Sequence, residues 1–165
     1  MPLHPSILMA QESPTEKSIH DGLSARLSGF VLEDLLPHRR PMLLIGEILA
    51  VDSVTAVTLS KADRTWPMAG PDGVSPLIFV ELAAQTAGVC NGWERIRKQG
   101  PESDQMGWLV GVKRAEFHVD LLPFDLPVTA RARNTLAFEK FREVTSQLHH
   151  KDHLLAEVVL QLYQA

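Results

Sequence analysis

The most continuous apolar segment of the chain runs from Pro76 to Gln99 and has the pattern of one buried helix. A proline lies in its first turn, where a missing backbone N–H costs nothing, and Gly100-Pro101 follows it as a stop signal. Apolar residues occupy nearly every side of its N-terminal half, which excludes a surface helix with one wet face. We therefore predict a helix over residues 76–99 that the rest of the chain encloses.

Small residues form a column along this predicted helix, with Ala84, Gly88 and Gly92 spaced four residues apart. Residues at this spacing lie on one face of a helix. A helical glycine costs about 1 kcal/mol relative to alanine unless packing recovers it. The column therefore predicts that another part of the backbone approaches the helix closely.

Two polar residues one turn apart, Glu81 and Gln85, interrupt the apolar half of the helix. An apolar environment disfavours the charged form of a carboxyl group. We therefore expect burial to raise the pKa of Glu81 toward neutral pH, where the group can donate or accept a proton.

Shorter apolar segments flank the helix. Residues 30–36 form an amphipathic turn of helix that ends at Pro37, because the residue before a proline avoids the helical region. The remaining segments, rich in β-branched residues, read as strands, and the last three are joined by short turns as in an antiparallel meander. The fold class predicted is α+β, with an antiparallel sheet wrapped around one long central helix. The predicted strands are residues 42–51, 55–62, 106–117, 126–138, 142–149 and 154–163.

The length and composition fit one globular domain with a single core: 165 residues, 45% of them hydrophobic. Residues 1–29 mix proline, serine, histidine and charge with little periodicity, so we expect a flexible N-terminal extension before a domain over residues 30–165.

Charge and cysteine content narrow the functional classes. A net charge of −4 argues against a general binder of nucleic acid or of membrane surfaces. No apolar run reaches the roughly 18 residues that span a bilayer, and no signal peptide is indicated. The single cysteine, Cys90, excludes a disulfide framework and suits a reducing compartment. We expect a soluble cytoplasmic protein without a metal or cofactor, because no nucleotide, metal or flavin motif is present.

Several segments together resemble the hot-dog-fold 3-hydroxyacyl-[acyl-carrier-protein] dehydratases of fatty acid synthesis. Their order and spacing match from about Val31 to Leu162, and the resemblance implies a hot-dog fold. The segments that carry it are Leu36 to Leu44, Phe79 to Gly88, Gly111 to Phe117, Pro123 to Asp125 and Ala156 to Val159.

One departure from the family pattern concerns the catalytic histidine, which the family places in a Gly-His-Phe-Pro-Gly loop before the helical glutamate. The corresponding stretch here, Trp66 to Gly70, has no histidine, and none lies between His38 and His118. The chain is more similar to an offshoot, the dehydratase-like subunit of bacterial aryl polyene clusters.

Dehydrating a 3-hydroxyacyl thioester requires a base for the α-proton and an acid for the departing hydroxyl. The resemblance makes Glu81 one member of this pair. We predict that His38 replaces the missing loop histidine as the base, within the chain or across a dimer interface. The alternative is that His38 only fastens the N-terminal helix through a hydrogen bond.

Substrate contacts are predicted around the start of the long helix. Backbone N–H groups between Ser75 and Ile78 are candidates to bind the thioester oxygen. Ser75 and Leu77 are therefore predicted substrate-binding residues. Gln85 is expected to orient or line the site. Trp66 either lines the acyl pocket or is an ordinary core residue.

Basic residues are candidates to dock an acidic acyl carrier protein with its phosphopantetheine phosphate, or are merely solvated strand faces. The open edges of a curled sheet favour a homodimer or a heterodimer with another hot-dog subunit. The docking candidates are Arg39, Arg40, Lys113 and Arg114.

Three functions fit these features. The first is dehydration of 3-hydroxyacyl thioesters, linked to acyl carrier protein or CoA, in fatty acid or polyene synthesis. The second is a non-catalytic hot-dog subunit that pairs with an active dehydratase, which the missing loop histidine would explain. The third is a thioesterase, in which the carboxylate activates water.

Overall fold

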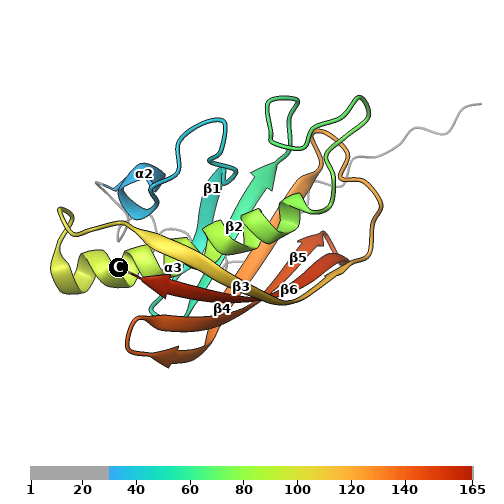
Figure 1. Cartoon of the computed structure of the whole chain (residues 1–165). Helices are drawn as coiled ribbons and strands as arrows, with labels where there is room; N and C mark the ends of the chain where they lie inside the picture. The colour runs from blue at the N-terminus through green and yellow to red at the C-terminus, as the bar shows by residue number, and fades with distance from the viewer. Residues whose placement is uncertain (1–29, 165) are drawn as a thin grey trace, which may run out of the picture.

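One long helix lies against one antiparallel six-stranded sheet, and the computed structural model describes residues 30–164. The strand order in the sheet is β1-β2-β4-β5-β6-β3, so the chain meanders through β4, β5 and β6 and places β3 at the edge beside β6 (Figure 1). The elements are α2 (Leu32–Leu35), β1 (Glu47–Val51), β2 (Thr55–Lys61), α3 (Ile78–Gln99), β3 (Gly107–Phe117), β4 (Pro127–Phe138), β5 (Phe141–His150) and β6 (His153–Gln164).

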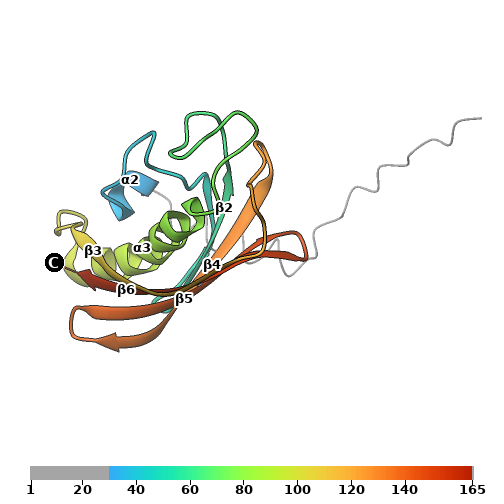
Figure 2. The ribbon, with the colours of Figure 1, turned by 45° about the vertical axis from the view of Figure 1, so that its right-hand side comes forward.

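The sheet curls around α3, which is the architecture predicted from the sequence (Figure 2). Small residues face the helix where β2 and β4 cross it, among them the buried Ala56, Ala130 and Ala132. A buried pair of hydroxyl groups, Thr58 Oγ1 and Thr86 Oγ1, lies 2.9 Å apart and links β2 to α3. The α+β hot-dog fold class is confirmed.

The sequence predicted a strand over residues 42–51, but only Glu47–Val51 form one, which corrects the prediction. Residues 42–46 form an irregular segment that buries Leu43, Leu44 and Ile45 in the core. The backbone N–H of Leu44 donates to Oε1 of Gln85 at 2.9 Å, so a side chain takes the place of a neighbouring strand. The other predicted strands agree with the observed bounds to within one or two residues.

The spacing of the small residues in α3 predicted a close approach by another segment, and the end of α2 packs against them. A methyl group added at Gly88 would lie 2.6 Å from Cδ2 of Leu36, and one added at Gly92 would collide with the carbonyl oxygen of Leu35. The buried Arg95 donates from its guanidinium group to the carbonyl oxygen of Asp34 at 2.9 Å. Helix α3 thus holds the short helix that leads directly to His38.

The expected N-terminal extension, residues 1–29, lies outside the described residues. Within the described part of the chain, no helix has the length and apolar character needed to cross a membrane.

Candidate active site

His38 and Glu81 lie together in one chain. Nε2 of His38 is 3.2 Å from Oε1 of Glu81, and the two side chains are 31% and 30% exposed. Nδ1 of His38 is buried and has no partner among the described residues, so Nε2 is the nitrogen that faces the carboxylate. The sequence prediction that these two residues meet is therefore matched by the geometry, and the contact needs no partner subunit.

Gln85 holds the carboxylate in place. Its amide nitrogen donates to Oε1 of Glu81 at 2.8 Å and to the carbonyl oxygen of Met42 at 2.6 Å, while its oxygen accepts from Leu44. All of these bonds involve a side chain that is only 1% exposed. Gln85 and His38 both bind Oε1 of Glu81. The other carboxylate oxygen, Oε2, has no hydrogen-bond partner among the described residues.

The pKa of Glu81 is lowered from its ordinary value, so the expectation of a raised pKa is wrong. The hydrogen bond from His38 is the largest cause, and the bond from Gln85 and the charge of His38 act in the same direction. Burial raises the pKa but is outweighed. Glu81 is therefore a carboxylate at neutral pH.

The segment that carries His38 is fixed by Arg39. The guanidinium group of Arg39 donates to the carbonyl oxygens of Leu36 at 2.9 Å and His38 at 2.8 Å. The peptide bond between Arg40 and Pro41 is cis. The two hydrogen bonds of Arg39, together with the packing of α2 against α3, hold the segment that carries His38.

A cavity of about 290 Å³ begins at the two residues and follows one face of α3. The helix contributes residues three and four positions apart, which is the spacing of a single helix face. The opposite walls come from the end of α2, from β3 and β6, and from the turn between β4 and β5. The α3 residues that line the cavity are Glu81, Ala84, Gly88, Asn91, Gly92, Glu94, Arg95, Lys98 and Gln99.

The other predicted substrate contacts lie elsewhere. Trp66 is buried in the core at 3% exposure, and its indole nitrogen has no described partner. Ser75 and Leu77 precede α3, and neither lines the cavity. The backbone N–H groups of residues 77–80 already donate to residues 75–77. Substrate contacts from Trp66, Ser75 and Leu77 stay predictions.

The predicted docking residues fall into two groups. Arg39 and Arg40 are exposed next to His38. Hydrogen bonds from Thr65 are the main cause that lowers the pKa of Asp63, and the charge of Arg40 acts in the same direction. Lys113 pairs with Glu143 at 3.0 Å and Arg114 with Glu116 at 3.4 Å, both on the sheet. Only the first group adjoins His38 in sequence.

A cluster that the sequence reasoning missed consists of Glu116, His118 and Glu157, whose potential metal-ligand atoms lie within 4.8 Å of one another. Both carboxylates already accept hydrogen bonds, Glu116 from Arg114 at 3.4 Å and Glu157 from Gln147 at 3.0 Å. Glu116 on β3 lies opposite Glu157 on β6, and His118 directly follows β3, so only the pairing of these two strands brings the three residues together.

Comparison with known proteins places the chain in a family. The ApeP-like family model, described as ApeP dehydratase, matches residues 30–165. The chain belongs to the ApeP-like family.

Two FabZ dehydratases, each called 3-hydroxyacyl-[acyl-carrier-protein] dehydratase, are similar in sequence. The one from Chlamydia trachomatis serovar L2 is 28% identical over 133 residues, which cover 76% of this chain and 84% of that protein. The one from Chlamydia pneumoniae is 27% identical over 136 residues, which cover 78% of this chain and 86% of that protein.

Solved structures show the same fold. The dehydratase heterocomplex ApeI:P from Xenorhabdus doucetiae matches this ApeP-like chain with a TM-score of 0.75 and 23% identity, covering 82% of this chain and 91% of that one. An HP0420 homologue from Helicobacter felis matches with a TM-score of 0.61 and 13% identity, covering 81% and 99%. The hot-dog fold expected from the sequence motifs is therefore confirmed.

Proposed function

We propose that this ApeP-like chain dehydrates 3-hydroxyacyl thioesters carried on acyl carrier protein, with His38 and Glu81 as its acid–base pair. The observation that carries the proposal is the 3.2 Å contact between His38 and Glu81 at one end of a cavity. Membership of a family described as dehydratase, and similarity to the FabZ enzymes, support the same reaction.

The lowered pKa of Glu81 supports roles that are the reverse of the sequence prediction. The lowered pKa makes Glu81 a carboxylate, and its Oε2 is free to accept the α-proton of the substrate. His38, whose Nε2–H donates to Oε1, then protonates the leaving hydroxyl group. The C–H and C–O bonds break, the double bond forms and water leaves. Transfer of the captured proton from Glu81 to His38 restores the pair.

The carrier protein would approach on the side of His38. Arg40 is exposed there and makes no hydrogen bond or ion pair with a described residue. An acidic carrier protein with a phosphate-bearing arm suits such a charge. Arg39, by contrast, is engaged in positioning the His38 segment, so Arg40 is the better docking candidate of the two.

A second hot-dog subunit would pair along β3. This strand has eleven residues, lies at the sheet edge and exposes large apolar side chains, among them Trp108 at 49%, Val110 at 57% and Val112 at 48%. A long apolar edge strand is a template for pairing with another chain. The ApeI:P dehydratase heterocomplex, which this chain resembles, supports association with a second dehydratase subunit.

The reaction is tested by hydration of a crotonyl thioester and dehydration of its 3-hydroxy product. Glu81→Gln and His38→Ala are each expected to lower the rate by about 10²–10⁴-fold, the usual contribution of a positioned acid or base. Glu102→Gln, in an exposed loop, is the matched control. Full activity in both site variants would refute the proposal, and release of free thiol from an acyl thioester would indicate a thioesterase instead.

The pairing is tested by light scattering on the purified chain, alone and mixed with an authentic hot-dog dehydratase. Val110→Lys should abolish whichever dimer forms, because it places a charge on the apolar edge. Leu121→Lys, at an exposed apolar residue outside the strands, should leave the dimer intact. A dimer that survives Val110→Lys would place the interface elsewhere.

A further inference from the structure

The outer face of the sheet carries the side chains that alternate with those packed against α3. On β4, Ala130 and Ala132 are buried where the strand crosses the helix. Successive side chains of a strand point to opposite faces of the sheet. Thr129 and Arg131 therefore lie on the face turned away from α3, from the catalytic pair and from the cavity that begins there.

A shallow hollow of about 460 Å³ lies on this outer face. It extends over the neighbouring strands β2, β4 and β5, and the short turn between β5 and β6 contributes its last two residues. Side chains held by strands of a sheet are positioned more precisely than side chains held by loops. The lining residues are Val57, Thr129, Arg131, Gln147, His149, Lys151 and Asp152.

Arg131 brings an unpaired positive charge to the hollow. It is exposed and makes no hydrogen bond or ion pair with a described residue. Its cross-strand neighbours are Val57 on β2 and Gln147 on β5, and neither carries a charge. The next residue in this row, Glu157 on β6, accepts a hydrogen bond from Gln147 at 3.0 Å. The guanidinium group of Arg131 is therefore left for a ligand.

Lys151 and His149 add further hydrogen-bond donors to the same hollow. Neither side chain has a hydrogen-bond or ion-pair partner in the described part of the chain. His149 pairs with Thr129, two residues before Arg131 on β4. The acidic member of the lining, Asp152, is exposed and forms no ion pair with a described residue. The two cationic groups thus remain unpaired.

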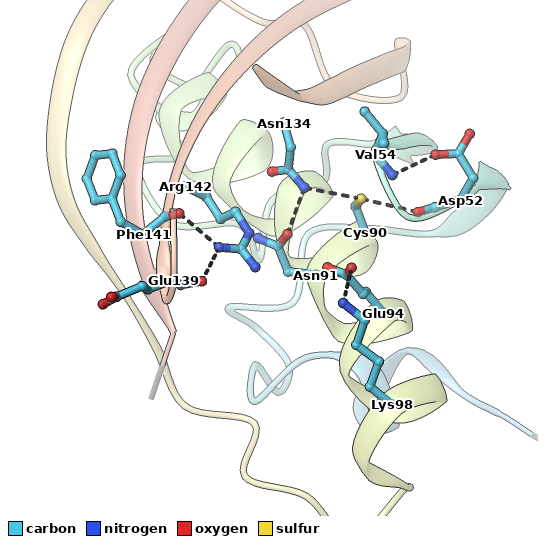
Figure 3. Close-up of polar contacts among 10 residues, drawn as sticks. All are labelled: Asp52, Val54, Cys90, Asn91, Glu94, Lys98, Asn134, Glu139, Phe141 and Arg142. Carbon is cyan, nitrogen blue, oxygen red and sulfur yellow. Dashed lines mark hydrogen bonds and ion pairs between the residues drawn. The ribbon is translucent and has the colours of Figure 1, made fainter. Parts of the chain in front are cut away.

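Arg142 shows the contrasting case of an arginine in this sheet that has partners. Its side chain extends from β5 toward α3, and Nη1 donates to the carbonyl oxygens of Glu139 at 2.6 Å and Phe141 at 2.9 Å (Figure 3). Arg131 has no carbonyl or carboxylate in this role among the described residues. A guanidinium group presents parallel N–H donors that match two oxygens of one oxyanion.

We propose that the hollow is a binding site for a phosphate monoester. Arg131 donates to two phosphate oxygens, and Lys151 and a ring N–H of His149 donate to the same group. A phosphate monoester carries close to two negative charges at neutral pH and offers three strong acceptor oxygens. It therefore suits two cationic groups better than a singly charged carboxylate or phosphate diester does. Because the hollow lies across the sheet from the catalytic pair, this second site does not depend on the proposed reaction.

A nuclear magnetic resonance titration of the full chain tests the inference. The three probes are inorganic phosphate, phenyl phosphate as a monoester, and dimethyl phosphate as the diester type found in lipid headgroups and nucleic acids. Sodium chloride keeps the ionic strength constant, so general screening of charge does not differ between the probes. Phenyl phosphate should shift the amide resonances of Thr129 and Lys151. Dimethyl phosphate, with half the charge, should bind about tenfold more weakly.

Variants locate the site. Arg131→Met keeps the length of the side chain but removes the guanidinium group, and it should weaken binding of phenyl phosphate by about tenfold or more. Lys151→Met should weaken it by about threefold or more, because it removes a single charged donor. Arg97→Met, at an exposed arginine on α3, is the matched control and should bind as the unaltered protein does.

Four outcomes overturn the inference: no shift of these two resonances with phenyl phosphate, equal affinity for the monoester and the diester, tighter binding of inorganic phosphate than of phenyl phosphate, or binding that survives Arg131→Met unchanged. The amide spectrum of each variant shows whether it is folded. The comparison of the three probes on the unaltered protein decides the question even if one variant is not folded. The rate of thioester dehydration, measured separately, leaves either result unaffected.

Discussion

His38 contacts Glu81 within the same chain, with 3.2 Å between Nε2 and Oε1. The loop before α3, where the family pattern considered in the sequence analysis has its histidine, has Trp66 in the core instead. A histidine from the segment after α2 thus stands against the helical glutamate. The contact between the two side chains is made within a single subunit, and it lowers the pKa of Glu81 together with the bond from Gln85.

The assignment of Glu81 as base predicts which variant loses exchange of the α-proton. In deuterated water, a saturated acyl thioester should exchange its α-protons with the unaltered protein and with His38→Ala, since no hydroxyl group has to leave. Glu81→Gln should reduce this exchange by about 10²–10⁴-fold. Proton magnetic resonance of the thioester measures it. The opposite pattern, with exchange lost only in His38→Ala, would make His38 the base.

Gln85 is expected to matter for stability as well as for activity. Gln85→Leu leaves the buried N–H of Leu44 without its acceptor and frees Glu81 from one donor. A buried donor without a partner costs about 1–3 kcal/mol, which should appear in the free energy of unfolding measured with urea. Gln147→Leu, at an exposed glutamine on β5, should cost less than about 0.5 kcal/mol. Equal costs for the two variants would contradict the bracing role of Gln85.

The stability of the protein should depend on pH through the charge of the Glu81 carboxylate. The pKa of Glu81 in the folded protein lies below the ordinary value of 4.5, so the carboxylate stabilises the fold above that pH. This contribution is lost as the pH falls through the lowered pKa of the folded state. The difference in melting temperature between the unaltered protein and Glu81→Gln should therefore shrink on acidification below pH 4.5. A difference that grows in acid would show that the pKa is raised.

The two glycines under α2 should respond differently to a methyl group. At Gly92 the methyl would meet the Leu35 backbone, whereas at Gly88 it would meet the end of the Leu36 side chain. Gly92→Ala should destabilise by roughly 1–3 kcal/mol through overpacking, despite a gain of about 1 kcal/mol in helix propensity. Gly88→Ala should cost less, because a side chain moves more easily than a backbone. Urea unfolding measures both, and a larger cost at Gly88 would be the contrary result.

Cys90 should be chemically inert in the folded protein. Burial raises the pKa of its thiol to about 12, and the side chain is 1% exposed while donating to the carbonyl oxygen of Asp52. Iodoacetamide requires the thiolate, so alkylation at pH 8 should be slow until urea unfolds the chain. Mass spectrometry follows the modification. Rapid labelling of the native protein would place Cys90 near solvent.

The sequence by itself determined the central helix, the strands and the fold class, because these depend on local periodicity and on breakers such as Gly100 and Pro101. It also indicated that another segment packs closely against the glycines at 88 and 92, since close packing recovers their cost in a helix. Glu81 and His38 were likewise identified as a pair from residue types and family spacing.

Only the tertiary structure decided the charge state and the surroundings of that pair. The pKa of Glu81 depends on whether burial or hydrogen bonds dominate, and the bonds from His38 and Gln85 are contacts between segments far apart in the chain or set by side-chain orientation. The loss of strand pairing over residues 42–46 has the same origin, because the Gln85 side chain takes the hydrogen bond of Leu44. The hollow on the outer face of the sheet, which Arg131 and Lys151 both line, required the pairing of β4 with β5.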